Sequence, residues 1–125
     1  MKIIDIVEEE PFEICLFLNL LFTKKTIGLL CYREFDGYLQ IDKFCIHKYF
    51  RGKGLGYKMI TFLKNDIVGN YPEIKWIQVY PKSEDTLSNT PIALQELYKK
   101  YERFGFRGDK NFSYSKRDQL MKLLL

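Results

Sequence analysis

A run of alternating glycines constrains this chain more than any other feature of its sequence. Residues 51–56 read RGKGLG, between a segment with strand-like composition and a segment with helical periodicity. Glycine carries no side chain to hold a ligand away from the backbone. The first amides of a helix have no partner inside the helix, and the helix dipole attracts an anion to them. With positive charge from Arg51 and Lys53, the run predicts a diphosphate-binding loop.

Two familiar nucleotide-binding loops do not fit this run. A Walker loop needs Gly-Lys followed by Ser or Thr, whereas Tyr57 follows the last glycine. A dinucleotide-binding fingerprint spaces its glycines differently and follows the first strand of a parallel unit, whereas this run follows a hairpin. A glycine-rich turn with solvated basic residues remains the alternative that assigns no ligand.

The rest of the chain predicts a mixed α/β sheet. Strand-like segments recur at residues 1–8, 12–22, 26–35, 38–47, 74–80 and 112–123, with a further strand beginning at Phe106. The segment 12–22 is ambiguous between strand and buried helix, because a short apolar run has no clear period. Strand is favoured there, since residues 23–26 could turn the chain back. The Asp36-Gly37 pair is a strong signal for a two-residue hairpin.

Two helices are expected among these strands. The first begins inside the glycine run, where apolar residues from Leu55 to Ile67 recur at helical spacing, and it ends at residues 69–72. The second begins at residues 88–91, where a capping side chain precedes a proline, and it ends at Gly105. This order gives a mixed, mostly antiparallel sheet of about six strands with a helix on either face.

The length and composition are those of one ordinary domain, residues 1–125. Apolar residues make up 46% and charged residues 29% of the chain, and the net charge is +4. This mild excess suits an anionic small molecule and does not require a nucleic acid. The three cysteines lie in apolar runs without metal-ligand spacing, so we expect neither a metal nor a disulfide framework. Without a signal peptide or a run long enough to cross a membrane, a cytoplasmic protein is expected.

The glycine run and a second motif resemble the GCN5-related N-acetyltransferases. The acyl-CoA signature of that family is Gln or Arg, two residues, Gly, one residue, then Gly or Ala, and Arg51, Gly54 and Gly56 fill it. Residues 101–106, YERFGF, resemble the Tyr-Glu-Lys-x-Gly-Phe ending of the family's next helix. The resemblance covers roughly residues 26–125, and it implies the family's fold and its use of acetyl-CoA.

The front of the chain departs from the family pattern. Family members usually carry two helices between their first strands, whereas only about 15 residues are available here. We therefore expect the fold to be short at its N-terminal end, and the resemblance assigns no residues to the acceptor site, which those helices line in the family. Asn89 lies further upstream of Tyr101 than the corresponding asparagine of the family lies from its tyrosine, so we do not assign the role of that asparagine to Asn89.

The resemblance also implies a set of site residues. Those expected to bind acetyl-CoA are Phe44, Cys45, Ile46, Arg51, Gly52, Lys53, Gly54, Leu55, Gly56 and Tyr57. The amide of Ile46 would polarise the thioester carbonyl, and Phe44 would lie along the pantetheine arm. Tyr101 matches the family's general acid, with Tyr98 in reserve, although an aromatic stripe on a helix is more often core.

The general base is less well indicated. In the family, a polar residue on the strand before the loop often serves. Asp42 is the carboxylate on that strand and shares a face with Gln40. His47, the single histidine, and Glu34 on the neighbouring strand are weaker candidates.

The expected activity is transfer of an acetyl or short acyl group from acetyl-CoA to a primary amine by direct attack. The acceptor would be a small molecule or a peptide, and the protein a monomer or homodimer. A CoA-binding module without catalytic activity is the main alternative, since the front helices are missing. Nucleic-acid binding through the basic loop is a third hypothesis, and it is not favoured.

Overall fold

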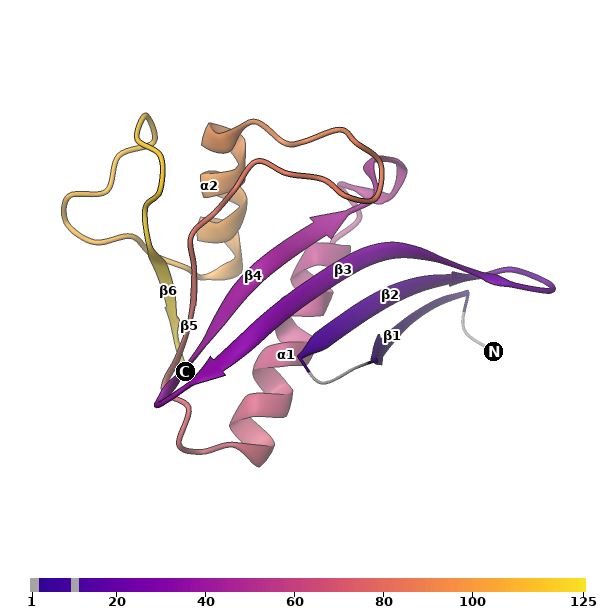
Figure 1. The fold of residues 1–125 in the computed structure, drawn as a ribbon, viewed down its shortest axis with the longest axis horizontal. Coiled ribbons are helices and arrows are strands. Elements are labelled where there is room, and N and C mark those ends of the chain that lie inside the picture. Colours follow the sequence, from indigo (N-terminus) through magenta and orange to yellow (C-terminus); the bar gives the residue numbers. More distant parts are fainter. Residues whose placement is uncertain (1–2, 10–11) are drawn as a thin grey trace.

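The computed structural model describes residues 3–9 and 12–125, so the first two residues of the expected strand 1–8 lie outside the described part. Six strands form one sheet in the order β1-β2-β3-β4-β5-β6 (Figure 1), and every neighbouring pair is antiparallel except β4 and β5, which are parallel. The strands are β1 (Ile4–Glu8), β2 (Glu13–Asn19), β3 (Lys24–Phe35), β4 (Tyr38–Ile46), β5 (Trp76–Val79) and β6 (Met121–Leu124). The helices are α1 (Leu55–Asn70) and α2 (Leu94–Phe104), with a short 3-10 helix at Lys48–Phe50. The predicted mixed sheet of about six strands is confirmed.

The hairpin signal at residues 36–37 is realised as predicted. Phe35 pairs with Tyr38, so Asp36 and Gly37 alone form the turn. Gly37 has φ of +84°, a left-handed conformation that glycine adopts without steric cost. This turn fixes the register of β3 and β4. β4 leads into the predicted phosphate loop, residues 51–56.

The ambiguous segment 12–22 forms a strand, as favoured. β2 pairs with β1 on one side and β3 on the other. Only residues 9–12 separate β1 from β2, which leaves no room for helices between them. The described residues therefore include no counterpart of the family's two front helices between β1 and β2.

Both helices pack on the same face of the sheet, which corrects the expected helix on either face. A Cβ atom added at Gly28 would lie 3.0 Å from Met59 Sδ of α1, so α1 covers the face to which Gly28 belongs. At the end of α2, a Cβ at Gly105 would lie 3.0 Å from Leu123. Leu123 pairs with Ile77, which pairs with Leu39, and cross-strand partners share a face. Leu39 also shares a small cavity with Ile67 of α1, and Figure 1 shows α1 crossing behind β3 and β4.

The other face of the sheet is stabilised by its own side chains. Phe35, Tyr38 and Trp76 form a continuous stack across three strands, with ring centroids 5.0 and 4.9 Å apart. Beside the stack, Gln78 accepts from Trp76 Nε1 at 2.9 Å and donates to Gln40 at 2.9 Å. These bonds give the polar side chains of this face their hydrogen-bond partners without a covering helix.

The second helix begins later than the sequence suggests. Its N-cap residue is Ala93, whereas the expected start at residues 88–91 is an irregular loop in which Asn89 has φ of +48°. The Ser88 hydroxyl does not cap the helix, because it bonds to Asp85 and accepts from the Lys48 amide. These contacts thus prevent Ser88 from capping the helix, although the local sequence predicted that it would. The end at Gly105 is as predicted, with φ of +106°.

The last strand is also shorter than expected. Of residues 112–123, only Met121 onward belong to a strand, and the strand expected at Phe106 is reduced to a single bridge between Arg107 and Lys122. The Gln119 side chain bonds to both the amide and the carbonyl of Ser113, closing a local turn. Such side-chain bonds compete with a regular ladder.

Candidate functional site

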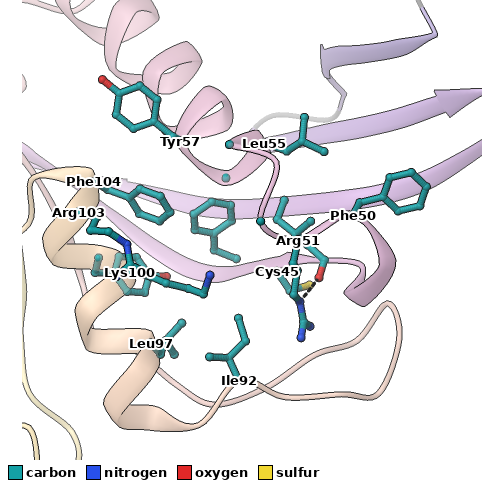
Figure 2. Close-up of a pocket in the computed structure, with 16 residues that line it drawn as sticks. Cys45, Phe50, Arg51, Leu55, Tyr57, Ile92, Leu97, Lys100, Arg103 and Phe104 are labelled. Carbon is teal, nitrogen blue, oxygen red and sulfur yellow. Dashed lines mark hydrogen bonds between the residues drawn. The ribbon is translucent and has the colours of Figure 1, made fainter.

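A cavity of about 340 Å³ lies between the start of α1 and the side of α2 (Figure 2). It is lined by Phe44, Cys45, Ile46, Phe50, Arg51, Gly52, Gly54, Leu55, Gly56, Tyr57, Ile92, Leu97, Lys100, Tyr101, Arg103 and Phe104. Nine of the ten residues predicted to bind acetyl-CoA line it, and the tenth, Lys53, does not. The predicted acid Tyr101 lines it too.

The backbone of the phosphate loop presents free donors to this cavity. The first amide that bonds into the helix is that of Lys58, which donates to the carbonyl of Gly54. The amides of residues 52–57 donate to no other described residue, in backbone or side-chain bonds, and no side chain caps the helix. Unpaired amides at a helix start favour an anion.

Glycine is required in this loop for two different reasons. Gly52 and Gly54 both have φ of +76°, which strains any residue with a Cβ, and open space surrounds both. Gly56 is helical, and a Cβ there would lie 3.1 Å from the ring of Phe104. The first two glycines shape the turn, and the third lets α1 approach α2.

The two central strands separate beside the loop. The β4–β5 ladder ends at Ile41 and Val79, although β4 continues to Ile46. The His47 amide donates to Ile27 of β3 at 2.7 Å. Because amides alternate in direction along an antiparallel strand, those of Phe44 and Ile46 point away from β3, toward the opening. The Ile46 amide therefore lies at the opening between β4 and β5, and its part in catalysis stays a prediction.

Arg51 has a different position from the one expected of a phosphate ligand. Its Nε donates to the Ile46 carbonyl at 2.9 Å, and its Nη2 donates to Asp85 Oδ2 at 3.0 Å (Figure 2 shows the first bond). The Asp85 side chain is fully buried and also accepts from the Ser88 hydroxyl and from the amides of Leu87, Ser88 and Thr90. Burial alone would raise the pKa of Asp85, but the hydrogen bonds from Ser88 and the loop amides prevail and hold this pKa well below its usual range. The charge of Arg51 is therefore already neutralised.

Tyr101 lies on the wall of the cavity with its ring against Phe44, Phe104 and Phe106. Its side chain is buried, yet its hydroxyl bonds to no described residue. Since the described residues include no buried side-chain oxygen without a partner, this hydroxyl must be open to the cavity. Burial, followed by the proximity of Cys45 and Glu84, raises the pKa of Tyr101 above its ordinary value. The phenol is thus a proton donor at neutral pH.

The reserve candidate Tyr98 is a core residue. It is fully buried, and its hydroxyl donates to the Lys116 carbonyl at 2.6 Å. His47 is buried as well, and its Nδ1 accepts from the Tyr49 amide at 3.3 Å, capping the short 3-10 helix. Both side chains hold structure together outside the cavity lining.

The two carboxylates considered as bases lie away from the cavity. Asp42 accepts from Arg33 Nε at 2.5 Å and from Arg33 Nη2 at 2.9 Å, beside Gln40. Glu34 lines a separate, smaller cavity near the far end of α1. Neither is brought next to Tyr101.

Sequence reasoning missed the contribution of α2 beyond Tyr101. Leu97, Lys100, Tyr101 and Phe104 are spaced three and four residues apart, so they share one side of the helix. That spacing could have identified Leu97 and Lys100 once Tyr101 was placed in the site. Ile92 in the loop before α2 carried no such signal. Among the described residues, no group of His, Cys, Asp or Glu side chains could hold a metal ion, and no described helix is long and apolar enough to cross a membrane.

Neither a protein-family model nor a curated protein matches the chain in sequence. In contrast, many solved structures match its fold. The anti-CRISPR protein AcrVA5 is 20% identical with a TM-score of 0.57, over 76% of this chain and 87% of that one. GCN5 from Tetrahymena is 13% identical with a TM-score of 0.62, over 92% of this chain and 69% of that one. PaiA N-acetyltransferase from Thermoplasma acidophilum, solved in complex with coenzyme A, is 11% identical with a TM-score of 0.60, over 90% of this chain and 60% of that one.

The likeness to these structures extends over most of this chain and concerns its fold. The chain has the fold of the GCN5-related N-acetyltransferases, in a form without helices between its first two strands.

Proposed function

We propose that this protein transfers an acetyl or short acyl group from acetyl-CoA to a primary amine. The observation that carries the proposal is the set of unpaired amides at residues 52–57, which opens into a cavity that extends to Tyr101. Diphosphate, pantetheine and thioester each meet a suitable partner in this arrangement, in that order. The likeness in fold to acetyltransferases, one of them bound to coenzyme A, supports it.

The cavity suits the different parts of acetyl-CoA chemically. The loop amides offer several donors to phosphate oxygens without a side chain in the way. Phe44, Ile92 and Leu97 offer an apolar wall for the pantetheine arm. The free amides of β4 face the gap between the strands, where a thioester carbonyl would accept from them.

The chain supplies two elements of the chemistry. The bound donor provides a thioester, whose carbonyl carbon an amine attacks directly. The Ile46 amide would stabilise the negative charge that develops on the carbonyl oxygen. Tyr101 would donate its proton to the sulfur as the C–S bond breaks and the C–N bond forms, so that the thiol leaves neutral. The attacking nitrogen would lose a proton to the general base, and solvent would return one to Tyr101.

The general base stays a prediction. Asp42 is the candidate from the sequence, but it does not line the cavity, and each of its oxygens accepts a hydrogen bond from Arg33. The acceptor is proposed as a small-molecule or peptide amine.

A titration of thermal stability tests the ligand class. Acetyl-CoA and CoA should raise the midpoint of unfolding, whereas ATP and NAD at equal concentration should not, because a ligand bound by the native state alone stabilises it. Release of free thiol from acetyl-CoA is then measured with a panel of amines that includes free lysine, spermidine and lysine-containing peptides. Binding of CoA with no transfer to any amine would favour the CoA-binding module. Equal stabilisation by all four nucleotides would remove the assignment.

A further inference from the structure

The wall of the cavity opposite the phosphate loop carries two cations that the sequence motifs do not include. Lys100 and Arg103 lie on α2, and both line the cavity. Neither takes part in the ion pairs formed by the described residues. Figure 2 shows the Lys100 side chain extending from α2 into the space between the helix and the loop.

The two cations that the sequence predicted as phosphate ligands, Arg51 and Lys53, are less accessible to a diphosphate in the cavity. Arg51 is paired with buried Asp85 and bonded to the Ile46 carbonyl. Lys53 does not line the cavity. The amides of the loop carry only the partial charge of a helix start. A diphosphate bound there would therefore keep most of its negative charge unless another group met it.

The end of α2 lies directly across from the start of α1. Phe104, the residue after Arg103, has its ring 3.1 Å from the position of a Cβ at Gly56. Lys100 is one turn earlier on the helix and is half-buried against the cavity. A diphosphate that accepts from the loop amides on one side thus presents its other side to these two cations.

We propose that Lys100 and Arg103 bind the diphosphate of CoA from the side opposite the loop amides. This inference rests on the proposed function and adds to it a second wall for the phosphate site. Hydrogen bonds between cations and phosphate oxygens are stronger than those between neutral groups. The affinity for CoA then depends on α2 as much as on the glycine motif.

The test compares the double variant Lys100→Gln/Arg103→Gln with the double variant Lys99→Gln/Lys110→Gln. The second pair removes the same net charge outside the cavity, since Lys99 pairs with Glu96 on the helix surface and Lys110 is exposed. Dissociation constants are measured by calorimetry for CoA, 3′-dephospho-CoA and pantetheine. The cavity variant should bind CoA and 3′-dephospho-CoA about tenfold or more weakly, and pantetheine as before. The control variant should bind all three ligands like the unmodified protein.

Each other outcome has a definite meaning. Unchanged binding of CoA, or a loss equal to that of the control, overturns the proposal. A loss for CoA but not for 3′-dephospho-CoA assigns the cations to the 3′-phosphate and overturns it as well. Weaker binding of pantetheine places Lys100 or Arg103 along the arm instead of the diphosphate. Should the double variant unfold, the two single variants are measured in its place. If the unmodified protein binds no CoA, the proposed function fails, which is distinct from failure of this inference.

Discussion

Arg51 and Asp85 join the phosphate loop to the segment that leads into α2. Nη2 of Arg51 lies 3.0 Å from Oδ2 of Asp85, whose side chain is fully buried. The same arginine satisfies the carbonyl of Ile46, which faces the opening where β4 has no partner strand. One side chain therefore fixes three segments that shape the cavity. The arginine of the motif is a positioning residue in this chain.

Replacing Asp85 by Asn should destabilise the protein by about 3 kcal/mol, because Arg51 keeps its charge and loses its partner in a largely buried setting. Urea unfolding at neutral pH measures the change. Glu84→Gln, at an exposed neighbouring position, should change stability by less than about 0.5 kcal/mol. Equal effects of the two substitutions would contradict the role given to Asp85.

The same carboxylate should make the protein sensitive to acid. The pKa of Asp85 is lower in the folded chain than its ordinary value of 3.8. Its contribution to stability is therefore complete above the pKa of the unfolded chain, about 4, and is lost as the pH falls from there through the folded pKa. The free energy of unfolding should decrease below about pH 4. In Asp85→Asn this part of the decrease should be missing, and an identical acid profile of the two proteins would refute the assignment.

Gly54→Ala should weaken binding of CoA more than it weakens the fold. The left-handed conformation at φ of +76° should cost about 1 kcal/mol of stability. The added methyl would also project into open space at a position that lines the cavity. Gly37→Ala is a matched control, since Gly37 has φ of +84° in the hairpin turn, outside the cavity lining. Both variants should lose similar stability, and only Gly54→Ala should lose affinity for CoA in a calorimetric titration.

Tyr101→Phe should slow acyl transfer by about a hundredfold while CoA still binds, because the ring remains and the proton donor is lost. Steady-state release of thiol and calorimetric binding separate the two effects. Because the pKa of Tyr101 is raised, the phenol stays protonated up to at least pH 10, so transfer should show no alkaline decline from this group between pH 7 and 10. Tyr98→Phe provides the contrast: it removes a core hydrogen bond to Lys116, so stability should fall by about 1 kcal/mol with little effect on turnover.

The sequence predicted the position of the glycine loop and the start of α1 because the relevant physics is local. Alternating glycines, a hairpin signal before them and helical periodicity after them are all read within about 30 residues. The six strands and the end of α2 at Gly105 follow from similar short-range signals. The unpaired amides of the loop could also be predicted, because the first amides of any helix have no partner within it.

The parts that sequence could not predict depend on contacts between distant segments. The sequence predicts Arg51 as a phosphate ligand, but in the fold Arg51 pairs with Asp85. It predicts Ser88 as a helix cap, but the Ser88 hydroxyl bonds to Asp85 and to the Lys48 amide instead. The face on which α2 packs depends in turn on the register of β6, which no short-range pattern encodes.

The face of the sheet that neither helix covers influences the cavity on the opposite face. The Tyr38–Trp76 stack and the Gln40–Gln78 bond join β4 to β5 at two alternate pairs of the ladder, just before the strands part after Ile41 and Val79. The width of the opening between β4 and β5 therefore depends on side chains that lie on the face opposite the cavity.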